Sequence, residues 1–327
     1  MNWALTAAGF GVGIVVGLTG MGGGALMTPV LVIFFNIPPL AAVSSDLVAS
    51  AVMKPVGSLV HIKRGRVDWN LVRWLCVGSV PAAFCGVLVT KAIGGNQLQK
   101  TVQVGLGIAL LLAVAGLVAR AFLRMREHAK RRAAASAGTG TADAPAPSRH
   151  AVSRVTVRPL PTMIVGAVGG LIVGMTSVGS GSLIIVALLA LYPMLRPNDL
   201  VGTDLVQAVP LVAAAAVGHL LYGEFQFSVT TSLLLGCIPG VFLGAQVSAR
   251  APGGLVRRAL AVVLLASSLK LLYASNLQLV LGVAGALVLG PLVWSWLRTR
   301  NGLPALARAE RTGAPRNRVA DPAPAST

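Results

Sequence analysis

Gly17-Leu18-Thr19-Gly20-Met21-Gly22-Gly23-Gly24 interrupts an apolar stretch near the start of the chain, and a similar run occurs once more. The second copy reads Gly174-Met175-Thr176-Ser177-Val178-Gly179-Ser180-Gly181. Both runs lie in apolar sequence long enough to be inside a membrane. A helix break at that depth frees backbone groups that lipid cannot satisfy, so it is tolerated only where protein buries it or where it lines a polar cavity. The pair therefore predicts two halves of one binding site.

The composition indicates a polytopic membrane protein. Of 327 residues, 55% are hydrophobic and 11% are charged, whereas soluble domains carry about 25% charged residues. The net charge is +18, but nine of the 27 Lys and Arg fall within residues 120–158, and six more lie from Arg298 onward. Basic residues confined to loops and ends are typical of the cytoplasmic flanks of membrane spans. No aromatic-basic interleaving or recognition fold accompanies them, so we expect no nucleic-acid partner.

Each half of the chain contains a glycine-broken pair of apolar stretches followed by three ordinary spans. The broken pairs cover residues 3–18 with 25–36, and 161–175 with 182–192. Each arm of the first pair is about 18–24 Å long at 1.5 Å per residue, which is less than the roughly 30 Å hydrocarbon core. The expected spans are 42–62, 71–93, 98–123, 200–221, 228–249 and 255–273, with an extra span at 276–297.

These stretches predict an all-α polytopic membrane protein of five segments. They are a first membrane repeat (1–123), a disordered basic cytoplasmic linker (124–160), a second membrane repeat (161–273), an extra transmembrane helix (274–297) and a disordered basic tail (298–327). The linker and the tail are rich in Arg, Ala and Pro, and such a composition cannot bury enough apolar surface to fold.

The two membrane repeats are homologous halves. A shift of 157 residues aligns Gly17, Thr19, Gly22 and Gly24 with Gly174, Thr176, Gly179 and Gly181, and a shift of 158 aligns a series of later residues. The aligned pairs of that later series include Asp46 with Asp204, His61 with His219, Gly65 with Gly223, Gly78 with Gly236, Pro81 with Pro239 and Gly86 with Gly244. So many matches across a single one-residue slip indicate a duplicated half.

The charges of the loops favour inverted repeats. If each broken pair enters the membrane and returns, the linker, Arg196, the loop 250–258 and the tail all lie on one side, which the positive-inside rule makes cytoplasmic. If each pair crosses instead, the repeats run parallel and the arginines of the tail face outward. Charge favours the first arrangement, although re-entrant and crossing pairs both stay open. Inverted repeats whose broken helices meet at the midplane are typical of secondary transporters.

The glycine runs and one lysine are the candidate substrate site. Two helix N-termini that converge after the runs present free N–H groups and partial positive charge, which bind an anion. Lys54 lies within an apolar span at a cost of at least about 2.5–3.5 kcal/mol, so we expect it to attract that anion. The alternatives are close helix packing by the glycines, and pairing with Asp46 or snorkelling by the lysine. The substrate-binding candidates are Thr19, Gly22, Gly23, Gly24, Lys54, Thr176, Gly179, Ser180 and Gly181.

The duplicated acids Asp46 and Asp204 are the candidates for proton coupling, because an intramembrane carboxylate can load and release a proton during transport. The alternative role is a helix N-cap, since a small polar residue precedes each. The duplicated histidines, His61 and His219, stand at the ends of their spans, where we expect them to anchor the helices at the interface.

The sequence predicts no enzyme. The three cysteines lack the CxxC spacing of a metal site, and the duplicated Asp and His are separated by about 22 Å along one helix, too far to share a site. We therefore expect no catalytic residue, no metal and no cofactor. An anion channel and a permease for a non-sulfur anion stay open beside the leading hypothesis of a secondary transporter for a small anion. A homo-oligomeric assembly also stays open.

Three motifs resemble the TauE/SafE family of sulfite exporters. They are the run G-x-x-x-G-L-T-G-M-G-G-G followed by T-P-V-L, the later S-S-D-L, and the loop H-I-K-R-G-R-V-D-W. The resemblance covers residues 5–123 and 162–273. It implies a permease for sulfite, sulfoacetate or another organosulfonate in the cell membrane, with proton coupling. The family's glycine-rich segment falls on Gly17 to Gly24 and its acidic segment on Ser44 to Asp46, while the second copy departs in having Ser177 and Ser180 in place of glycines.

Overall fold

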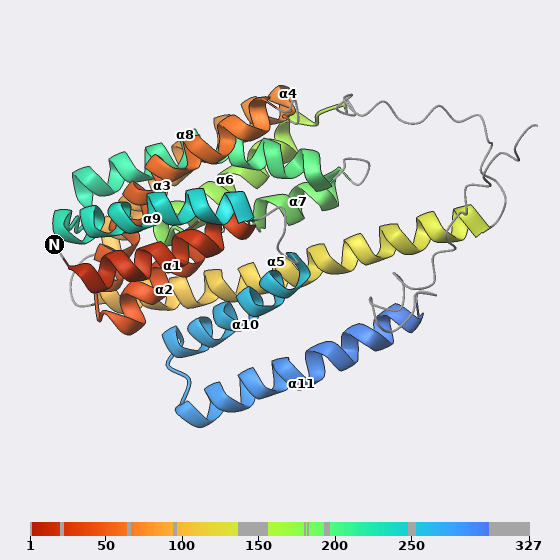
Figure 1. The fold of residues 1–327 in the computed structure, drawn as a ribbon. Helices are drawn as coiled ribbons and strands as arrows, with labels where there is room; N and C mark the ends of the chain where they lie inside the picture. The colour runs from red at the N-terminus through yellow and green to blue at the C-terminus, as the bar shows by residue number, and fades with distance from the viewer. Residues whose placement is uncertain are drawn as a thin grey trace, which may run out of the picture.

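The computed structural model describes residues 2–19, 23–63, 67–93, 97–136, 156–179, 181, 183–192, 197–247 and 253–300. Within these ranges the chain forms only α-helices and no strand, so the all-α prediction is confirmed (Figure 1). The helices are α1 (Trp3–Thr19), α2 (Gly24–Phe34), α3 (Pro39–Lys63), α4 (Trp69–Ile93), α5 (Gln97–Ser136), α6 (Pro159–Thr176), α7 (Leu183–Leu191), α8 (Pro197–Tyr222), α9 (Phe227–Val247), α10 (Gly253–Leu271) and α11 (Asn276–Arg300).

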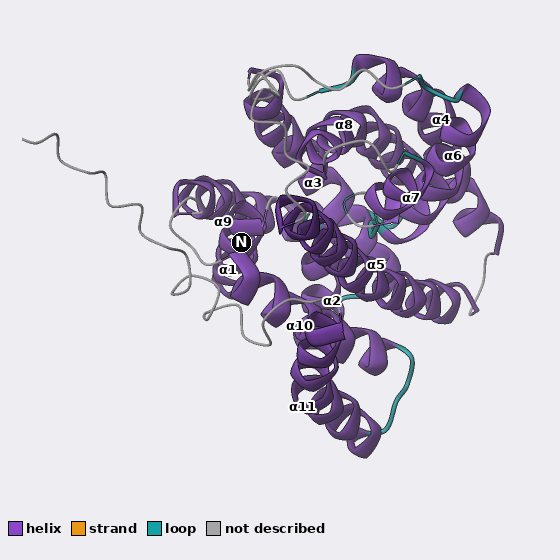
Figure 2. Ribbon diagram, turned by 90° about the vertical axis from the view of Figure 1, so that its right-hand side faces the viewer, coloured by secondary structure: helices purple, strands orange, loops and turns teal. Residues whose placement is uncertain are grey.

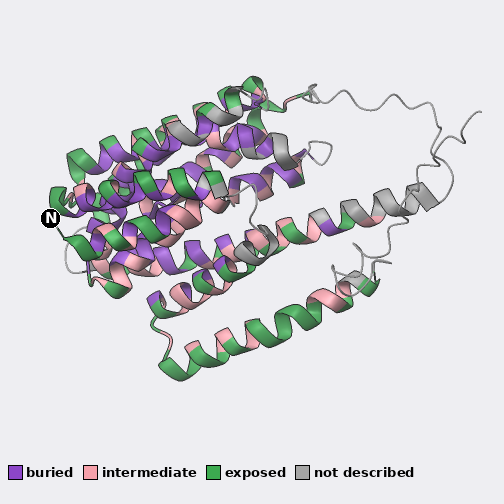
Figure 3. Cartoon of the chain, viewed as in Figure 1, coloured by how far each residue is buried: buried purple, intermediate pink, exposed green. Residues whose placement is uncertain are grey.

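Six of these helices are long and apolar enough to cross a membrane. The apolar segments are Trp69–Ile93, Leu98–Leu123, Pro159–Thr176, Gly202–Tyr222, Phe227–Gly244 and Asn276–Leu297. Helices α1 and α2 are apolar but shorter. The last of the six, in α11, buries none of its residues and lies beside α10, apart from the main bundle (Figures 1 and 3).

Helix α5 continues beyond the boundary expected from the sequence. It is helical as far as Ser136, whereas we expect a disordered linker from residue 124. The added segment is made largely of Arg, Lys, Glu and Ala, which are strong helix formers. The rest of the expected linker up to residue 155, and the tail from residue 301, lie outside the described residues.

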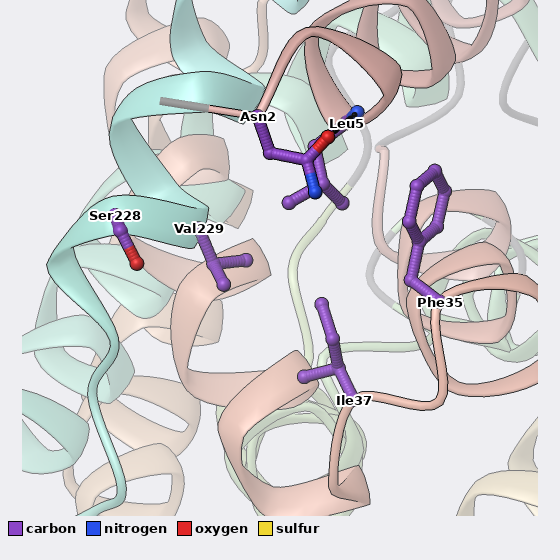
Figure 4. A pocket seen from close by; sticks show the side chains of 6 residues that line it. All are labelled: Asn2, Leu5, Phe35, Ile37, Ser228 and Val229. Carbon is purple, nitrogen blue, oxygen red and sulfur yellow. Dashed lines mark hydrogen bonds between the residues drawn. The ribbon is translucent and has the colours of Figure 1, made fainter.

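Each glycine-broken pair folds as a hairpin. Asn2, ahead of α1, lines the same cavity of about 370 Å³ as Phe35 and Ile37, which follow α2 (Figure 4). In the second half the backbone N–H of Arg158, ahead of α6, donates a 2.8 Å hydrogen bond to the hydroxyl of Tyr192, which follows α7. The chain therefore leaves each break toward the end of the bundle at which it entered.

The first helix of each half packs against the other half. Helix α1 lies along α9, and α6 lies along α4 (Figure 2). Both pairs run parallel. Along α1 and α9, Gly236 meets Thr6 and Gly244 meets Ile14, and along α4 and α6, Gly166 meets Leu75 and Gly174 meets Ala83. A Cβ on Gly236 would overlap the carbonyl oxygen of Thr6 and lie 2.7 Å from the nitrogen of Phe10. Glycine is thus needed for backbones to approach this closely.

Helices α3 and α8, which correspond to each other in the two halves, run in opposite directions. Near the start of α3, the hydroxyl of Ser44 lies 2.9 Å from Nδ1 of His219, near the end of α8. After the end of α3, the N–H of Asp68 donates a 3.1 Å hydrogen bond to Thr203, near the start of α8. Helices α3 and α8 are therefore antiparallel, and they form the centre of the bundle around which the two hairpins sit.

A side chain at Gly236 should destabilise the fold. Replacing Gly236 with Val should lower the free energy of unfolding by about 1–3 kcal/mol, because the added methyl groups force α1 and α9 apart. Thermal unfolding of the purified protein in detergent measures the change. The control is Gly285→Val on α11, where a Cβ would meet nothing within 4 Å. Equal unfolding temperatures for the two variants would contradict this account of the α1–α9 contact.

Candidate functional site

The two helix breaks touch each other. Gly24 is the first residue of α2, and a Cβ there would overlap both the carbonyl and the hydroxyl of Ser177. Ser177 is the residue that follows α6, and its backbone turns into the left-handed region at φ 59°. The start of α2 in the first half and the end of α6 in the second are thus in direct backbone contact.

Asp46 is hydrogen-bonded to both sides of this contact. The carboxylate is fully buried within α3, and one of its oxygens, Oδ2, accepts hydrogen bonds from Thr28 of α2 at 3.1 Å and from Ser177 at 2.5 Å. A buried carboxylate is costly unless donors satisfy it. Here the donors come from both halves of the chain, so the carboxylate joins the hairpin of the first half to the break of the second.

Lys54 links the two duplicated acids. Only 7% of its surface is exposed, and its charge lies close enough to Asp204 and Asp46 to interact electrostatically with both. Asp204, buried within α8, also interacts with the charge of Arg120 from α5. The centre of the bundle therefore holds two acidic and two basic side chains near one another.

The two acids are not helix N-caps. Asp46 lies inside α3 and Asp204 inside α8, each several residues after the first residue of its helix. The N-cap alternative is therefore wrong for both. Their role in proton coupling stays a prediction.

The remaining candidates occupy several positions around the second break. Thr176 ends α6, and its hydroxyl donates to the carbonyl of Ile172 at 2.6 Å and accepts from the N–H of Val178 at 3.2 Å, so it closes its own helix. Gly179 is buried and has φ 118°, a conformation that favours glycine. Gly181 is half-buried ahead of α7.

Two of the candidates lie outside the described residues, and a third is described only in its backbone. Gly22 and Ser180 lie outside the described residues, as does the side chain of Thr19 at the end of α1. Gly23 is buried immediately before α2 and caps it without a side-chain hydrogen bond.

The expectation that His219 anchors its helix at the interface is wrong. The side chain has no exposed surface, and its Nε2 lies 2.8 Å from the carbonyl oxygen of Gly174 in α6. Because a carbonyl only accepts, Nε2 donates, and His219 ties the end of α8 to the last turn before the second break. The histidine stands at the end of its span in sequence, but α6 and α3 cover that end. The side chain of His61 lies outside the described residues.

Sequence reasoning did not select Thr28, Ser177 and Arg120. Thr28 stands between a methionine and a proline in an apolar arm, and Arg120 stands near the end of a span, where arginines commonly reach the interface. Ser177 carried a signal, because it is one of the positions where the second run departs from glycine. A polar residue in place of a glycine at a break indicates that a hydrogen bond is made there.

Comparison with known proteins identifies relatives over most of the chain. The family model "Sulfite exporter TauE/SafE" matches residues 5–271. The "Probable membrane transporter protein YjnA" of Bacillus subtilis (strain 168) is 32% identical over 274 residues, which are 83% of this chain and 100% of that protein. The "Probable membrane transporter protein YdhB" of the same organism is 23% identical over 72% of this chain and 86% of its own length. No solved structure matches.

Removing the hydroxyl of Ser177 should weaken the junction of the two breaks. The variant Ser177→Ala should lose about 1.5–3 kcal/mol of stability, the range for a hydrogen bond to a charged group. Thermal unfolding in detergent is the measurement, with Ser295→Ala as the control because that hydroxyl donates to the carbonyl of Leu292 within its own helix at 2.8 Å. A Ser177 variant as stable as the control would show that the bond to Asp46 contributes little.

Proposed function

Because the chain belongs to the TauE/SafE sulfite exporter family, we propose that it moves sulfite or an organosulfonate across the membrane at the contact between its two helix breaks. The family and the curated relatives are membrane transporters, not enzymes. The chain is accordingly a multi-pass membrane transporter, and the resemblance found in its motifs is confirmed. The substrate, the site and the coupling are the proposal.

The observation that carries the proposal is the direct contact of Gly24 with Ser177 beside charged side chains. The start of α2 brings its backbone N–H groups and partial positive charge to this point. Lys54 adds a full positive charge on the neighbouring α3. The hydrogen-bond donors and the positive charge that an anion needs are therefore already in place in this region before the anion binds.

We further propose that the halves are inverted repeats with re-entrant hairpins. The antiparallel course of α3 and α8 supports this arrangement, as does the return of each hairpin to its own end of the bundle. In such transporters one repeat rocks against the other around a fixed site, which opens alternately to the two sides. The site at the contact between the halves lies where such a motion would expose it.

Proton coupling follows from the charges of the centre. With Asp46, Asp204, Lys54 and Arg120 all ionised, the four side chains sum to zero charge. An anion that enters such a cluster brings an uncompensated negative charge into a region of low dielectric, which is costly. Protonation of one aspartate offsets that charge, so the anion and a proton are expected to move together.

Flux measurements test the transport proposal. Purified protein in liposomes should take up labelled sulfite or sulfoacetate faster when a pH gradient supplies protons on the side of the anion. An anion channel would instead show conductance without dependence on the proton gradient. Uptake of chloride or nitrate in place of every sulfur anion would assign the chain to a non-sulfur substrate and overturn the proposed one.

Loss of the buried lysine charge should reduce transport. We expect Lys54→Gln to raise the KM for the anion at least about tenfold, because its charged interaction with the anion contributes more than 1.4 kcal/mol. The control is Lys270→Gln, since Lys270 is exposed on α10 and bonds to Asn276 at 3.3 Å. An unchanged KM in Lys54→Gln would remove this residue from the site.

Cysteine labelling tests the orientation. In a variant without native cysteines, Ser275→Cys between α10 and α11 should react with an impermeant reagent in intact cells. Asn70→Cys at the start of α4 should react only after permeabilisation, because the basic ends of the helices are expected in the cytoplasm. Both positions are exposed. The opposite pattern of labelling would reverse the proposed orientation.

A further inference from the structure

We propose that the second oxygen of Asp46, with the hydroxyl of Ser50, forms a subsite for a hydrogen-bond donor carried by the transported anion. The substrate class is then a small sulfonate with an ammonium or hydroxyl group at its other end, rather than a bare oxyanion. This inference rests on the proposed function and specifies which organosulfonates the site accepts.

The geometry at the first break carries the inference. Oδ1 of Asp46 and Oγ of Ser50 are both buried, and neither makes a hydrogen bond of good geometry with the residues that the structure describes, while the Ser50 hydroxyl lies close enough to interact with the Asp46 carboxylate. Both face Gly23, because a Cβ placed there would lie 3.8 Å from each of the two oxygens. Two buried polar atoms that can each take a further hydrogen bond therefore lie beside the same place, directly ahead of α2.

The chemistry of these two atoms specifies what they bind. The other carboxylate oxygen, Oδ2, already receives the hydroxyls of Thr28 and Ser177. Leaving a buried acceptor without a donor costs about 1–3 kcal/mol, and more for a charged group. A bare dianion would place its own oxygens against Oδ1, which repels them. An N–H or O–H group of the ligand satisfies Oδ1, and Ser50 can accept from it as well.

The same face of α3 offers the complementary charge for the sulfonate. Asp46, Ser50 and Lys54 follow at intervals of four residues, so they lie on one face of the helix. Lys54 starts about 12 Å beyond Asp46 along the axis, at 1.5 Å per residue. Side chains on a helix lean toward its N-terminus, which brings the ammonium group back toward Asp46. Along this face of α3 an acceptor is followed by a hydroxyl and then by a cation. This order matches a ligand with a hydrogen-bond donor at one end and a negative group at the other.

The second repeat does not duplicate this subsite. The shift of 158 residues aligns Asp46 with Asp204, but Ser50 with Ala208 and Lys54 with Val212. The subsite is therefore specific to α3 and is not a general consequence of the duplicated fold.

Three sulfonates of nearly equal size isolate the donor. They are 2-aminoethanesulfonate, 2-hydroxyethanesulfonate and propane-1-sulfonate, which end in an ammonium, a hydroxyl and a methyl group. Isothermal titration calorimetry of the purified full-length chain in detergent gives Kd for each. We expect propane-1-sulfonate to bind at least about tenfold more weakly than the best donor-bearing analogue, because a site built for a donor rejects an analogue that lacks it.

Two substitutions locate the effect. Asp46→Asn should bring the three Kd values to within about threefold of one another, because the amide oxygen takes the place of Oδ2, which receives Thr28 and Ser177, and an NH2 donor then replaces the acceptor Oδ1. Ser50→Ala should also reduce the differences among the three Kd values. The control is Ser268→Ala, which removes a buried hydroxyl of α10 that bonds within its own helix at 2.8 Å. This control should keep the wild-type ratios of Kd.

The outcomes separate this inference from the proposed function. Equal Kd values for the three sulfonates in the wild-type chain overturn the donor subsite while leaving sulfonate transport intact. If the Kd values are equal and all three affinities rise with added Na⁺, Oδ1 binds a cation instead. If no sulfonate or sulfite binds, the proposed function itself fails. A preference for the ammonium alone identifies an ion pair with Asp46, and equal preference for ammonium and hydroxyl identifies a neutral hydrogen bond. The wild-type series decides the matter even if Asp46→Asn does not fold.

Discussion

The carboxylate of Asp46, buried between the two helix breaks, is the interaction on which the rest of the arrangement depends. A helix that ends inside a bilayer leaves N–H and C=O groups that lipid cannot satisfy, so the break must be covered by protein. In this chain each break covers the other, with Gly24 against the backbone of Ser177. Backbone contact alone does not fix the position of one break relative to the other. The hydrogen bonds from Thr28 and Ser177 to one carboxylate oxygen of Asp46 fix that position.

The packing of the long helices makes that junction possible. Each hairpin's first helix lies against a helix of the opposite half, α1 along α9 and α6 along α4, at distances that only glycine permits. The two halves are thus interlocked rather than stacked side by side. Because the hairpins are carried on the partner half, any movement between the halves also moves one break relative to the other. The proposed site lies at the contact that such a movement changes.

The sequence predicts more of the framework than of the junction. Apolar length and the repeated glycines locate the helices and the breaks, because both depend on local sequence alone. The partners of Asp46 depend on which helices lie together, and nothing in an apolar arm distinguishes Thr28 from a packing residue. His219 illustrates the same limit, since its place at the end of a span predicts a position at the membrane interface, whereas α6 covers it. For α5 the boundary moves because charged helix formers extend a helix past the apolar stretch.

The unequal chemistry of the two halves predicts that the two arrangements of the proposed transport cycle differ in stability. At the offset of 157 residues, Thr28 aligns with Ile185 and Ser177 with Gly20, so neither hydroxyl donor to Asp46 has a counterpart for Asp204. If the halves exchange roles when the site opens to the other side, Asp204 takes the place of Asp46 but has no equivalent pair of hydroxyls. The arrangement described here, with its two hydrogen bonds to a buried charge, is then the more stable of the two. A ligand or a proton that satisfies the carboxylates in the other arrangement is needed to populate it, and this requirement couples the movement of the halves to what the site holds.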